Sequence, residues 1–289
     1  MSDVIARAAD MRAWSAEMRR KGARIGLVPT MGALHDGHLA LVRQAQRECG
    51  AVVVSLFVNP LQFGPQEDFN RYPRDFEADV AQLEALHVDA VFHPTVDEMY
   101  PDGPSATRVS VERLSAALCG RVRPGHFSGV ATVVAKLLNL VSPDAAYFGQ
   151  KDWQQLVVVR TMARDLNFPT QIVGVPTVRE DRGLARSSRN AYLSEAERER
   201  AAAIFRGLDS ARTAYQNGER SASALTALVQ DSVRAQALEP EYVELVHPDT
   251  LTPLADAGEW ALIAVAVPVG RARLIDNVLL GQAPGSASI

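Results

Sequence analysis

Residues 51–58 read AVVVSLFV, a run of eight in which only Ser55 is polar. An uninterrupted apolar run of this length is typical of a strand buried on both faces, as strands are inside a parallel sheet. Shorter β-prone runs occur at 25–28, 90–92, 145–148 and 172–175. Amphipathic segments that predict helices separate them, near 37–45, 75–86, 127–141 and 153–166. This alternation predicts right-handed βαβ units and a doubly wound parallel α/β sheet.

The two ends of the chain follow other patterns. Apolar residues from Val4 to Met18 have the spacing of an amphipathic helix. Residues 179–189 are rich in charge, Gly and Ser, and predict a loop. Two helices, at 194–215 and 223–237, and three strands, at 242–246, 261–267 and 273–280, are expected to follow it. We therefore expect two domains, 1–177 and a smaller α+β domain 178–289, with a disordered tail over 284–289.

Composition and charge exclude several classes of protein. Hydrophobic residues make up 47 % of the 289 residues and charged residues 22 %, a balance that argues against a disordered chain. The net charge of −4 argues against a protein whose main role is to bind nucleic acid through a basic face. Two cysteines are too few for a disulfide framework, and the longest apolar stretch is too short for a membrane helix. Acidic residues near the N-terminus argue against a signal peptide, so we expect a cytoplasmic protein.

The first of three polar clusters is 31–38, MGALHDGH, which follows a predicted strand and opens a helix. Doubly wound folds bind ligands beyond the carboxyl ends of their strands. His35 and His38 are three residues apart and share a face of that helix. The helix N-terminus offers free backbone N–H groups and favours an anion, with phosphate the obvious guest. The alternatives are two surface histidines or a zinc site, for which further ligands at suitable spacing are lacking.

The other two clusters are Gly149–Asp152 and Arg186–Arg189. Asp152 can cap the helix that follows it, which leaves the Lys151 ammonium free to reach a phosphate. Two hydroxyls and two guanidiniums in 186–189 suit a triphosphate, although solvated loops have the same composition. Gln62 and Gln155, with apolar neighbours, suit a small and partly apolar carboxylate. The sequence has no Walker loop, no Gly-x-Gly-x-x-Gly and no Gly-x-Ser-x-Gly.

Five blocks, taken together and in order, resemble one known family. They are PTMGALH at 29–35, FVNPLQF at 57–63, RPGHF at 123–127, FGQKDWQQ at 148–155 and SSRN at 187–190. The histidine block and the serine-rich basic loop resemble the HIGH superfamily of nucleotidyltransferases and class I aminoacyl-tRNA synthetases. The full set resembles the pantothenate synthetase (pantoate–β-alanine ligase) family over nearly the whole chain.

The resemblance implies a fold and a reaction. The fold would be a Rossmann-like first domain with a C-terminal lid domain, in a homodimer. Pantoate and ATP, with Mg²⁺, would give pantoyl-adenylate and pyrophosphate, and β-alanine would then displace AMP to give pantothenate. The loop 179–189 is the candidate for a closing segment.

The resemblance also implies roles for individual residues. His38, His35 and Lys151 would be catalytic, with His38 as the donor. Gln62 and Gln155 would bind pantoate, Gln62 would also border β-alanine, and Asp79 would lie near Mg²⁺. Asn59, Arg123 and His126 match secondary positions of the family. The ATP site would comprise Met31, Gly32, Ala33, Leu34, His35, Asp36, Gly37, His38, Gly149, Gln150, Lys151, Asp152, Val178, Arg186, Ser187, Ser188 and Arg189.

One departure and three rival functions stay open. The family usually has leucine or methionine where this chain has Arg186, which either contacts a phosphate or points to solvent. A nucleotidyltransferase acting on a phosphorylated acceptor would want a basic pocket in place of Gln62 and Gln155. A non-catalytic ATP sensor would bind nucleotide without any exchange reaction. A tRNA synthetase would carry an anticodon-binding domain and a basic surplus, neither of which is evident, so we expect neither nucleic-acid nor membrane partners.

Overall fold

The chain forms two compact units in the computed structural model, which describes residues 2–65, 67–103 and 107–282. The first unit comprises Met1–Ser115, Arg123–Gln150 and Gln155–Pro176. The second comprises Ala116–Val122, Lys151–Gln154 and Thr177–Ile289. Two short segments that precede residue 177 thus belong to the second unit, which no sequence pattern indicated. The functional division at residues 177 and 178 stays a prediction, and the predicted tail lies outside the described residues.

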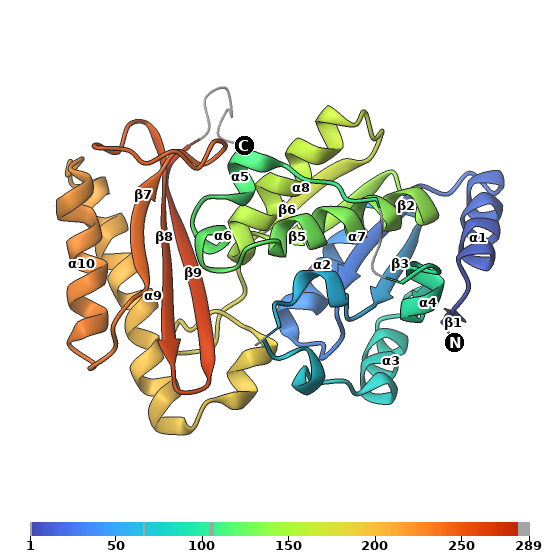
Figure 1. The fold of residues 1–289 in the computed structure, drawn as a ribbon, viewed down its shortest axis with the longest axis horizontal. Helices are drawn as coiled ribbons and strands as arrows, with labels where there is room; N and C mark the ends of the chain where they lie inside the picture. Colours follow the sequence, from blue (N-terminus) through green and yellow to red (C-terminus); the bar gives the residue numbers. More distant parts are fainter. Residues whose placement is uncertain (1, 66, 104–106, 283–289) are drawn as a thin grey trace. The chain divides into compact units, whose positions relative to one another are not determined.

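The first unit is built on a six-stranded sheet in which every pair of neighbours is parallel (Figure 1). The strand order is β1-β4-β3-β2-β5-β6. The chain winds outward from β2 through β3 and β4 on one side and through β5 and β6 on the other, so the winding direction switches between β2 and β5. The strands are β1 (Asp3–Ile5), β2 (Ile25–Thr30), β3 (Ala51–Leu56), β4 (Ala90–Phe92), β5 (Ala145–Gly149) and β6 (Gln171–Val175).

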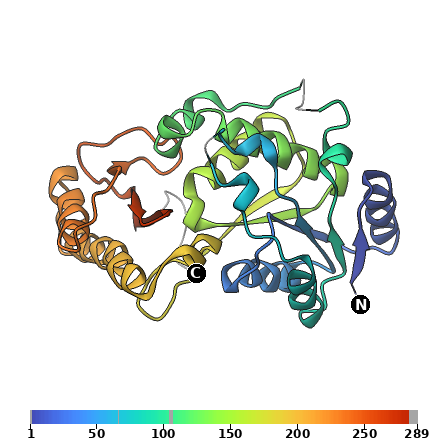
Figure 2. The same ribbon diagram turned by 60° about the horizontal axis from the view of Figure 1, so that its bottom comes forward.

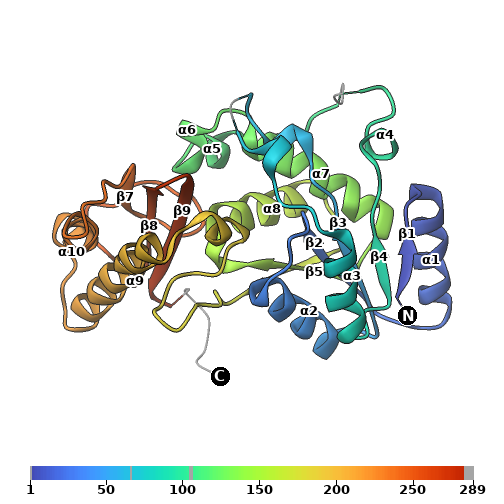
Figure 3. The same ribbon diagram turned by 90° about the horizontal axis from the view of Figure 1, so that it is seen from below.

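Helices cover both faces of this sheet, as the doubly wound prediction requires. Figure 3 shows α2 and α3 on one face and α7 and α8 on the other. The long helices of the unit are α1 (Ala8–Arg20), α2 (Asp36–Glu48), α3 (Phe76–Ala85), α7 (His126–Val141) and α8 (Trp153–Asp165). Short turns of helix join them: η1 (Pro60–Gln62), η2 (Phe69–Arg71), α4 (Val96–Met99), α5 (Glu112–Ser115) and η3 (Gln150–Asp152).

Burial explains why the central strands are so apolar in sequence. All six residues of β3 are buried, including the polar Ser55. Side chains of α2 and α3, among them Val42 and Leu83, pack on β2, β3 and β5 in one cluster. Most residues of α7 are buried as well, so this helix is apolar around most of its circumference. The sheet is therefore a rigid base for the loops at its carboxyl edge.

The sequence prediction was wrong about the first residues of the chain. The predicted helix from Val4 begins only at Ala8, and Asp3–Ile5 form the edge strand β1. Val4 pairs with Val91 of β4, and its side chain is 52 % exposed. A strand of three residues is held by backbone pairing with a distant segment, so local periodicity carries no signal for it.

The second unit is an α+β layer, as predicted. Its antiparallel sheet has the order β7-β8-β9, with β7 at Tyr242–Val246, β8 at Trp260–Val269 and β9 at Ala272–Gly281. The helices α9 (Glu195–Gln216) and α10 (Ala222–Arg234) lie side by side against it (Figure 2). The short helices of the unit are α6 (Cys119–Val122) and η4 (Ser188–Tyr192).

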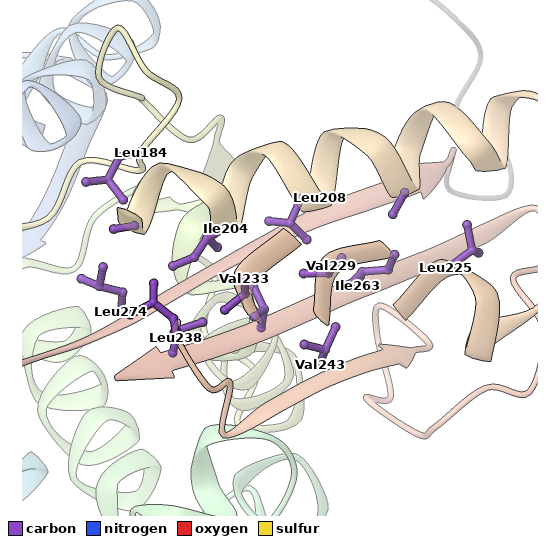
Figure 4. Packing of buried hydrophobic residues seen from close by; sticks show 14 of the residues in the cluster. Leu184, Ile204, Leu208, Leu225, Val229, Val233, Leu238, Val243, Ile263 and Leu274 are labelled. Carbon is purple, nitrogen blue, oxygen red and sulfur yellow. The ribbon is translucent and has the colours of Figure 1, made fainter. Parts of the chain in front are cut away.

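The core of the second unit lies between these helices and the sheet. Figure 4 shows Ile204 and Leu208 of α9 and Val229 of α10 in one cluster with Ile263 of β8. A capping box opens α9, because Ser194 accepts from the Glu197 N–H and the Glu197 carboxylate accepts from the Ser194 N–H. Across the described residues, no helix combines the length and apolarity that spanning a bilayer requires.

Candidate active site

The turn after β2 carries the histidine block, and its backbone conformation is unusual. Gly32 and Ala33 both have positive φ angles, +83° and +51°. The Thr30 hydroxyl accepts from the Gly32 N–H at 3.2 Å and donates to the Ser55 carbonyl of β3 at 2.8 Å. A Cβ on Gly32 would lie 2.8 Å from Oδ2 of Asp79. Glycine is therefore required at position 32 by both its φ angle and its surroundings.

Asp79 of α3 lies against this turn. Its Oδ2 accepts from the Ala33 N–H at 2.8 Å, and its Oδ1 accepts from the Leu34 N–H at 2.7 Å. The residue is 3 % exposed. Burial raises the pKa of this carboxyl, and the two backbone hydrogen bonds oppose that rise without cancelling it. Both carboxylate oxygens are thus engaged by main-chain N–H groups.

His35 and His38 lie at the start of α2, with their rings stacked. The ring centroids are 4.0 Å apart and the planes are inclined by 27°, so the predicted shared face is confirmed. His35 is the N-cap, and its Nδ1 accepts from the Gly37 N–H at 3.1 Å. An acceptor Nδ1 places the proton of a neutral His35 on Nε2, which is then a donor.

The backbone N–H groups at this helix start are more engaged than the sequence suggested. Ala33 and Leu34 donate to Asp79, Gly37 donates to the His35 ring, and His38 donates to the His35 carbonyl at 2.8 Å. The expectation of free N–H groups was therefore wrong for these four residues. The positive end of the helix dipole and the imidazole donors are what this site offers an anion.

Gln62 follows β3 on η1, where a buried polar network holds its side chain. Asn59 donates from Nδ2 to the Gln62 Oε1 at 3.2 Å and to the Gly129 carbonyl at 3.1 Å. Gln62 in turn donates from Nε2 to Sδ of Met31 at 3.0 Å. Tyr100 donates its hydroxyl to the Asn59 Oδ1 at 2.9 Å, and burial raises the pKa of that phenol. The network joins the ends of β2 and β3.

A second cluster fixes the main chain at Gln62. The Gln62 carbonyl lies 2.7 Å from Nδ1 of His126, and Nε2 of His126 lies 3.1 Å from the Arg123 guanidinium. Because arginine only donates, His126 accepts at Nε2 and donates from Nδ1 to the carbonyl. Arg123 also grips both carboxylate oxygens of Glu67, at 2.8 and 2.5 Å. Burial raises the pKa of Glu67, but the bonds and charge of Arg123 outweigh it and the pKa is lowered overall.

The end of β5 lies beside the end of β2, because the two strands are parallel neighbours. Gly149 closes β5 and Gln150 begins the turn that follows it. Gln155 is in the first turn of α8 and is half-buried. The sheet thus brings Gly149 to the same edge as the turn at 31–38, as the sequence predicted for carboxyl ends of neighbouring strands.

The remaining predicted residues belong to the second unit. The Lys151 ammonium lies 3.6 Å from Asp152, and the Lys151 carbonyl accepts from Asn277 of β9 at 2.8 Å. In the loop after β6, the Val178 carbonyl accepts from the Arg186 N–H at 2.9 Å. Ser187 caps η4, which contains Ser188 and Arg189, by accepting from the Arg189 N–H.

Arg186 has a partner of its own within the second unit. Its guanidinium lies 3.6 Å from Oε1 of Glu180, whose side chain is 19 % exposed. Glu180 also accepts from Asn190 at 3.0 Å and pairs with Arg198 at 3.3 Å. The ion pair with Glu180 is neither of the two alternatives left for Arg186. Through its contacts with Asn190 and Arg198, Glu180 also ties the loop to η4 and α9.

Several supporting residues were not found from sequence. Tyr100, Glu67 and Glu180 contact Asn59, Arg123 and Arg186, which lie 41, 56 and 6 positions away in the chain. Isolated tyrosines and glutamates carry no local signal, and only tertiary contacts reveal them. Among the described residues, no three His, Cys, Asp or Glu side chains gather as a metal site. The zinc alternative therefore finds no support in that part of the chain.

Comparison with known proteins identifies the family. The profile of the family described as Pantoate-beta-alanine ligase matches residues 3–279. The chain is 52 % identical over 274 residues to the pantothenate synthetase of Pelotomaculum thermopropionicum, covering 94 % of this chain and 97 % of that protein. It is likewise 52 % identical over 278 residues to the pantothenate synthetase of Geobacillus kaustophilus, covering 96 % and 92 %.

Solved structures agree with this result. The crystal structure of pantothenate synthetase from Thermus thermophilus matches with a TM-score of 0.90 and 51 % identity, covering 96 % of this chain and 98 % of that one. The pantoate-beta-alanine ligase from Francisella tularensis, complexed with beta-gamma ATP and beta-alanine, matches with a TM-score of 0.81 and 32 % identity over the same shares. The family that the five sequence blocks resemble is thus confirmed, and the chain belongs to the pantoate–β-alanine ligase family.

Proposed function

We propose that this protein condenses pantoate with β-alanine, consumes ATP, and passes through a pantoyl-adenylate with release of pyrophosphate and AMP. One observation carries the proposal beyond family membership. The hydrogen bond from Gln62 to Met31 joins an uncharged amide site to the end of β2, the strand whose following turn leads to the paired histidines at the start of α2. An anion site beside a neutral acid site is what adenylation of a carboxylic acid requires.

The neutral character of the amide site suits pantoate. Gln62 and Gln155 bind its polar groups through amide hydrogens, with Gln62 also bordering β-alanine. An arginine or lysine paired with the pantoate carboxylate would withdraw charge from the oxygen that has to attack. Amide donors orient the molecule and leave that oxygen nucleophilic. A nucleotidyltransferase that acts on a phosphorylated acceptor, the rival function, would favour cationic side chains at positions 62 and 155.

In the first step, a carboxylate oxygen of pantoate attacks the α-phosphorus of ATP, and the bond to the bridging oxygen of pyrophosphate breaks. His35 donates from Nε2, and His38 is the main catalytic donor to the phosphates. The other residues to which the resemblance gave a nucleotide-binding role keep that role in this proposal. They are Gly149, Gln150, Lys151, Asp152, Val178 and Arg186–Arg189. Removing one charge-stabilising donor typically costs roughly 10²- to 10³-fold in rate.

Mg²⁺, when bound to the phosphates of ATP, supplies further neutralisation of their charge. Mg²⁺ keeps several waters and usually takes only one or two carboxylates besides phosphate oxygens. Asp79 is a poor fit for one of these carboxylates, because each of its oxygens already accepts a main-chain N–H and the residue is buried. No step is therefore assigned to a metal bound through Asp79.

In the second step, the amine of β-alanine attacks the acyl carbon, the bond to the phosphate oxygen of AMP breaks, and the ammonium proton passes to solvent. A mixed anhydride is sensitive to water, so exclusion of solvent protects it. The loop 179–189 is our candidate for the closing segment. We also propose a homodimer, which sedimentation equilibrium would test.

The experiment that tests this function is ATP–pyrophosphate exchange with pantoate and Mg²⁺, with β-alanine left out. Exchange that depends on pantoate supports the adenylate half-reaction, and AMP release on adding β-alanine supports the second. Binding of ATP without exchange would contradict the proposal and favour the sensor. Exchange with phosphorylated alcohols in place of pantoate would favour the nucleotidyltransferase.

A further inference from the structure

Asp79 and the turn it contacts are 45 residues apart in sequence. The carboxylate lies on the first turn of α3, and its two oxygens receive the Ala33 and Leu34 N–H groups at 2.8 and 2.7 Å. The residue is 3 % exposed, so water competes little for these bonds. A carboxylate that accepts from two main-chain donors makes charge-assisted bonds, which are stronger than neutral ones.

The geometry of the turn explains why an acidic residue is there. Successive residues with positive φ, here Gly32 at +83° and Ala33 at +51°, turn their neighbouring N–H groups toward one side. Such concave arrangements of main-chain donors bind anions, including phosphates and carboxylates. In this chain the anion is the side chain of Asp79, so the Ala33 and Leu34 N–H groups are occupied before any nucleotide arrives.

We infer that Asp79 is a positioning residue, which holds the 32–34 turn in shape and thereby sets His35 and His38, and that it is not a ligand of Mg²⁺. Electrostatics favours this assignment. The positive ends of two N–H dipoles lie at the oxygens that a metal would need, and a cation there would meet them at short range. The Mg²⁺ role that the family resemblance suggested for Asp79 is thus replaced by a structural one.

A cavity makes the turn depend on these two bonds. It has a volume of about 500 Å³. Gly32 and Asp79 line it together with Phe57 just after β3, Phe76 of α3 and His93 just after β4. On that side the turn is therefore not held by close packing. His35 follows the turn directly as the N-cap of α2, so a displaced turn moves its ring. A misplacement near 1 Å costs on the order of 100-fold in rate even when no reacting group is removed.

The test compares Asp79→Asn, Asp79→Ala and a control, Asp75→Asn. Asparagine keeps one oxygen acceptor at position 79, whereas alanine keeps none. Asp75 caps the same helix, accepting from the Ala78 N–H at 3.1 Å, and lines the same cavity, and asparagine preserves a cap. The first readout is hydrogen exchange of peptides covering 31–36, in metal-free buffer with EDTA and without nucleotide. The second is pantoate-dependent ATP–pyrophosphate exchange as a function of Mg²⁺ concentration.

We expect Asp79→Ala to exchange about tenfold faster over 31–36, since it loses two charge-assisted bonds, with Asp79→Asn in between and Asp75→Asn unchanged. The rate at saturating Mg²⁺ should fall about 10- to 100-fold in Asp79→Ala, while the half-saturating Mg²⁺ concentration stays within about twofold. If Asp79→Ala fails to fold, Asp79→Asn alone decides the question.

Two results would overturn the inference. One is unchanged hydrogen exchange over 31–36 in both Asp79 variants. The other is a rise of about tenfold or more in the half-saturating Mg²⁺ concentration in Asp79→Asn, which is the behaviour of a lost ligand. The kinetic readout rests on the proposed function, but the metal-free hydrogen exchange does not. A wild-type protein without pantoate-dependent exchange would therefore refute the function and leave the assignment of Asp79 to be decided by hydrogen exchange.

Discussion

Gly129 of α7 allows the closest backbone approach at the amide site. A Cβ on Gly129 would lie 2.2 Å from the Leu61 carbonyl oxygen and 2.7 Å from the Gln62 nitrogen. Both are main-chain atoms of η1, so no flexible side chain can move aside. Asn59 also donates to the Gly129 carbonyl, which ties the helix to the residue that holds the Gln62 amide.

The change Gly129→Ala therefore has a predictable size. Ordinary C···O contacts begin near 3.3 Å, so η1 or α7 has to shift by about 1 Å. Overpacking of this kind costs about 1–3 kcal/mol, whereas glycine to alanine inside a helix normally gains about 0.5–1 kcal/mol. Because the clash is with backbone, we take the upper end and expect a net loss of about 2 kcal/mol. A shift of about 1 Å at Gln62 should also lower kcat/KM for pantoate roughly 100-fold.

Urea denaturation and steady-state kinetics with pantoate varied would measure both effects. Gly50→Ala is the matched control, because its Cβ would lie 3.6 Å from Ala23, an ordinary contact. We expect that control to stay within about 0.5 kcal/mol of wild type. The reasoning is refuted if Gly129→Ala unfolds no more easily than wild type and keeps its kcat/KM for pantoate within about threefold.

Three further predictions concern the same site. Tyr100→Phe removes the hydroxyl bond to Asn59 and should cost about 0.5–1.5 kcal/mol in urea denaturation with a raised KM for pantoate; wild-type values for both would exclude a supporting role. Arg123 lowers the pKa of Glu67, so their contact stabilises the fold above the unfolded pKa and is lost as pH falls through the lower folded value. Between about pH 5 and pH 3, unfolding free energy should thus fall less steeply in Glu67→Gln than in wild type, and parallel curves would contradict this. His38→Ala should lower ATP–pyrophosphate exchange about 10²- to 10³-fold with an unchanged circular dichroism spectrum, whereas a near-normal rate would rule out its catalytic role.

Hydrophobic runs predicted the sheet because they report burial directly. The apolar run at 51–58 became β3, buried on both faces, and the alternation with helices fixed the doubly wound class. Strand β1 was not predicted because its three residues, Asp3–Ile5, are held by backbone pairing with Ala90–Phe92. For a related reason, the sequence did not predict that segments 116–122 and 151–154 belong to the second unit. Which segments form a compact unit depends on contacts between residues that are distant in the chain.

The residues of the site likewise divide into those that local sequence patterns predict and those that only tertiary contacts reveal. Periodicity sufficed for His35 and His38, because residues three apart on a helix meet whatever the rest of the chain does. It did not suffice for Asp79, whose partners are two main-chain N–H groups 45 and 46 positions away. In sequence a buried acidic residue that anchors a turn and one that binds a metal look the same. Arg186 is a similar case, since only the fold shows that Glu180 is its partner.

Functional residues in this chain are held mainly through their own backbone or an adjacent one. Asp79 holds the turn before His35, His126 holds the Gln62 carbonyl, and Asn277 holds the Lys151 carbonyl. Main-chain anchors of this kind fix where a side chain starts without using its functional group. Reactions that depend on positioning charged groups benefit from this division, because little ordering remains to be done when substrate binds. A substitution at such an anchor should therefore lower kcat without removing any group that touches substrate. Conservative replacements that keep the donor of His126 or Asn277, or the acceptor of Asp79, should restore much of it.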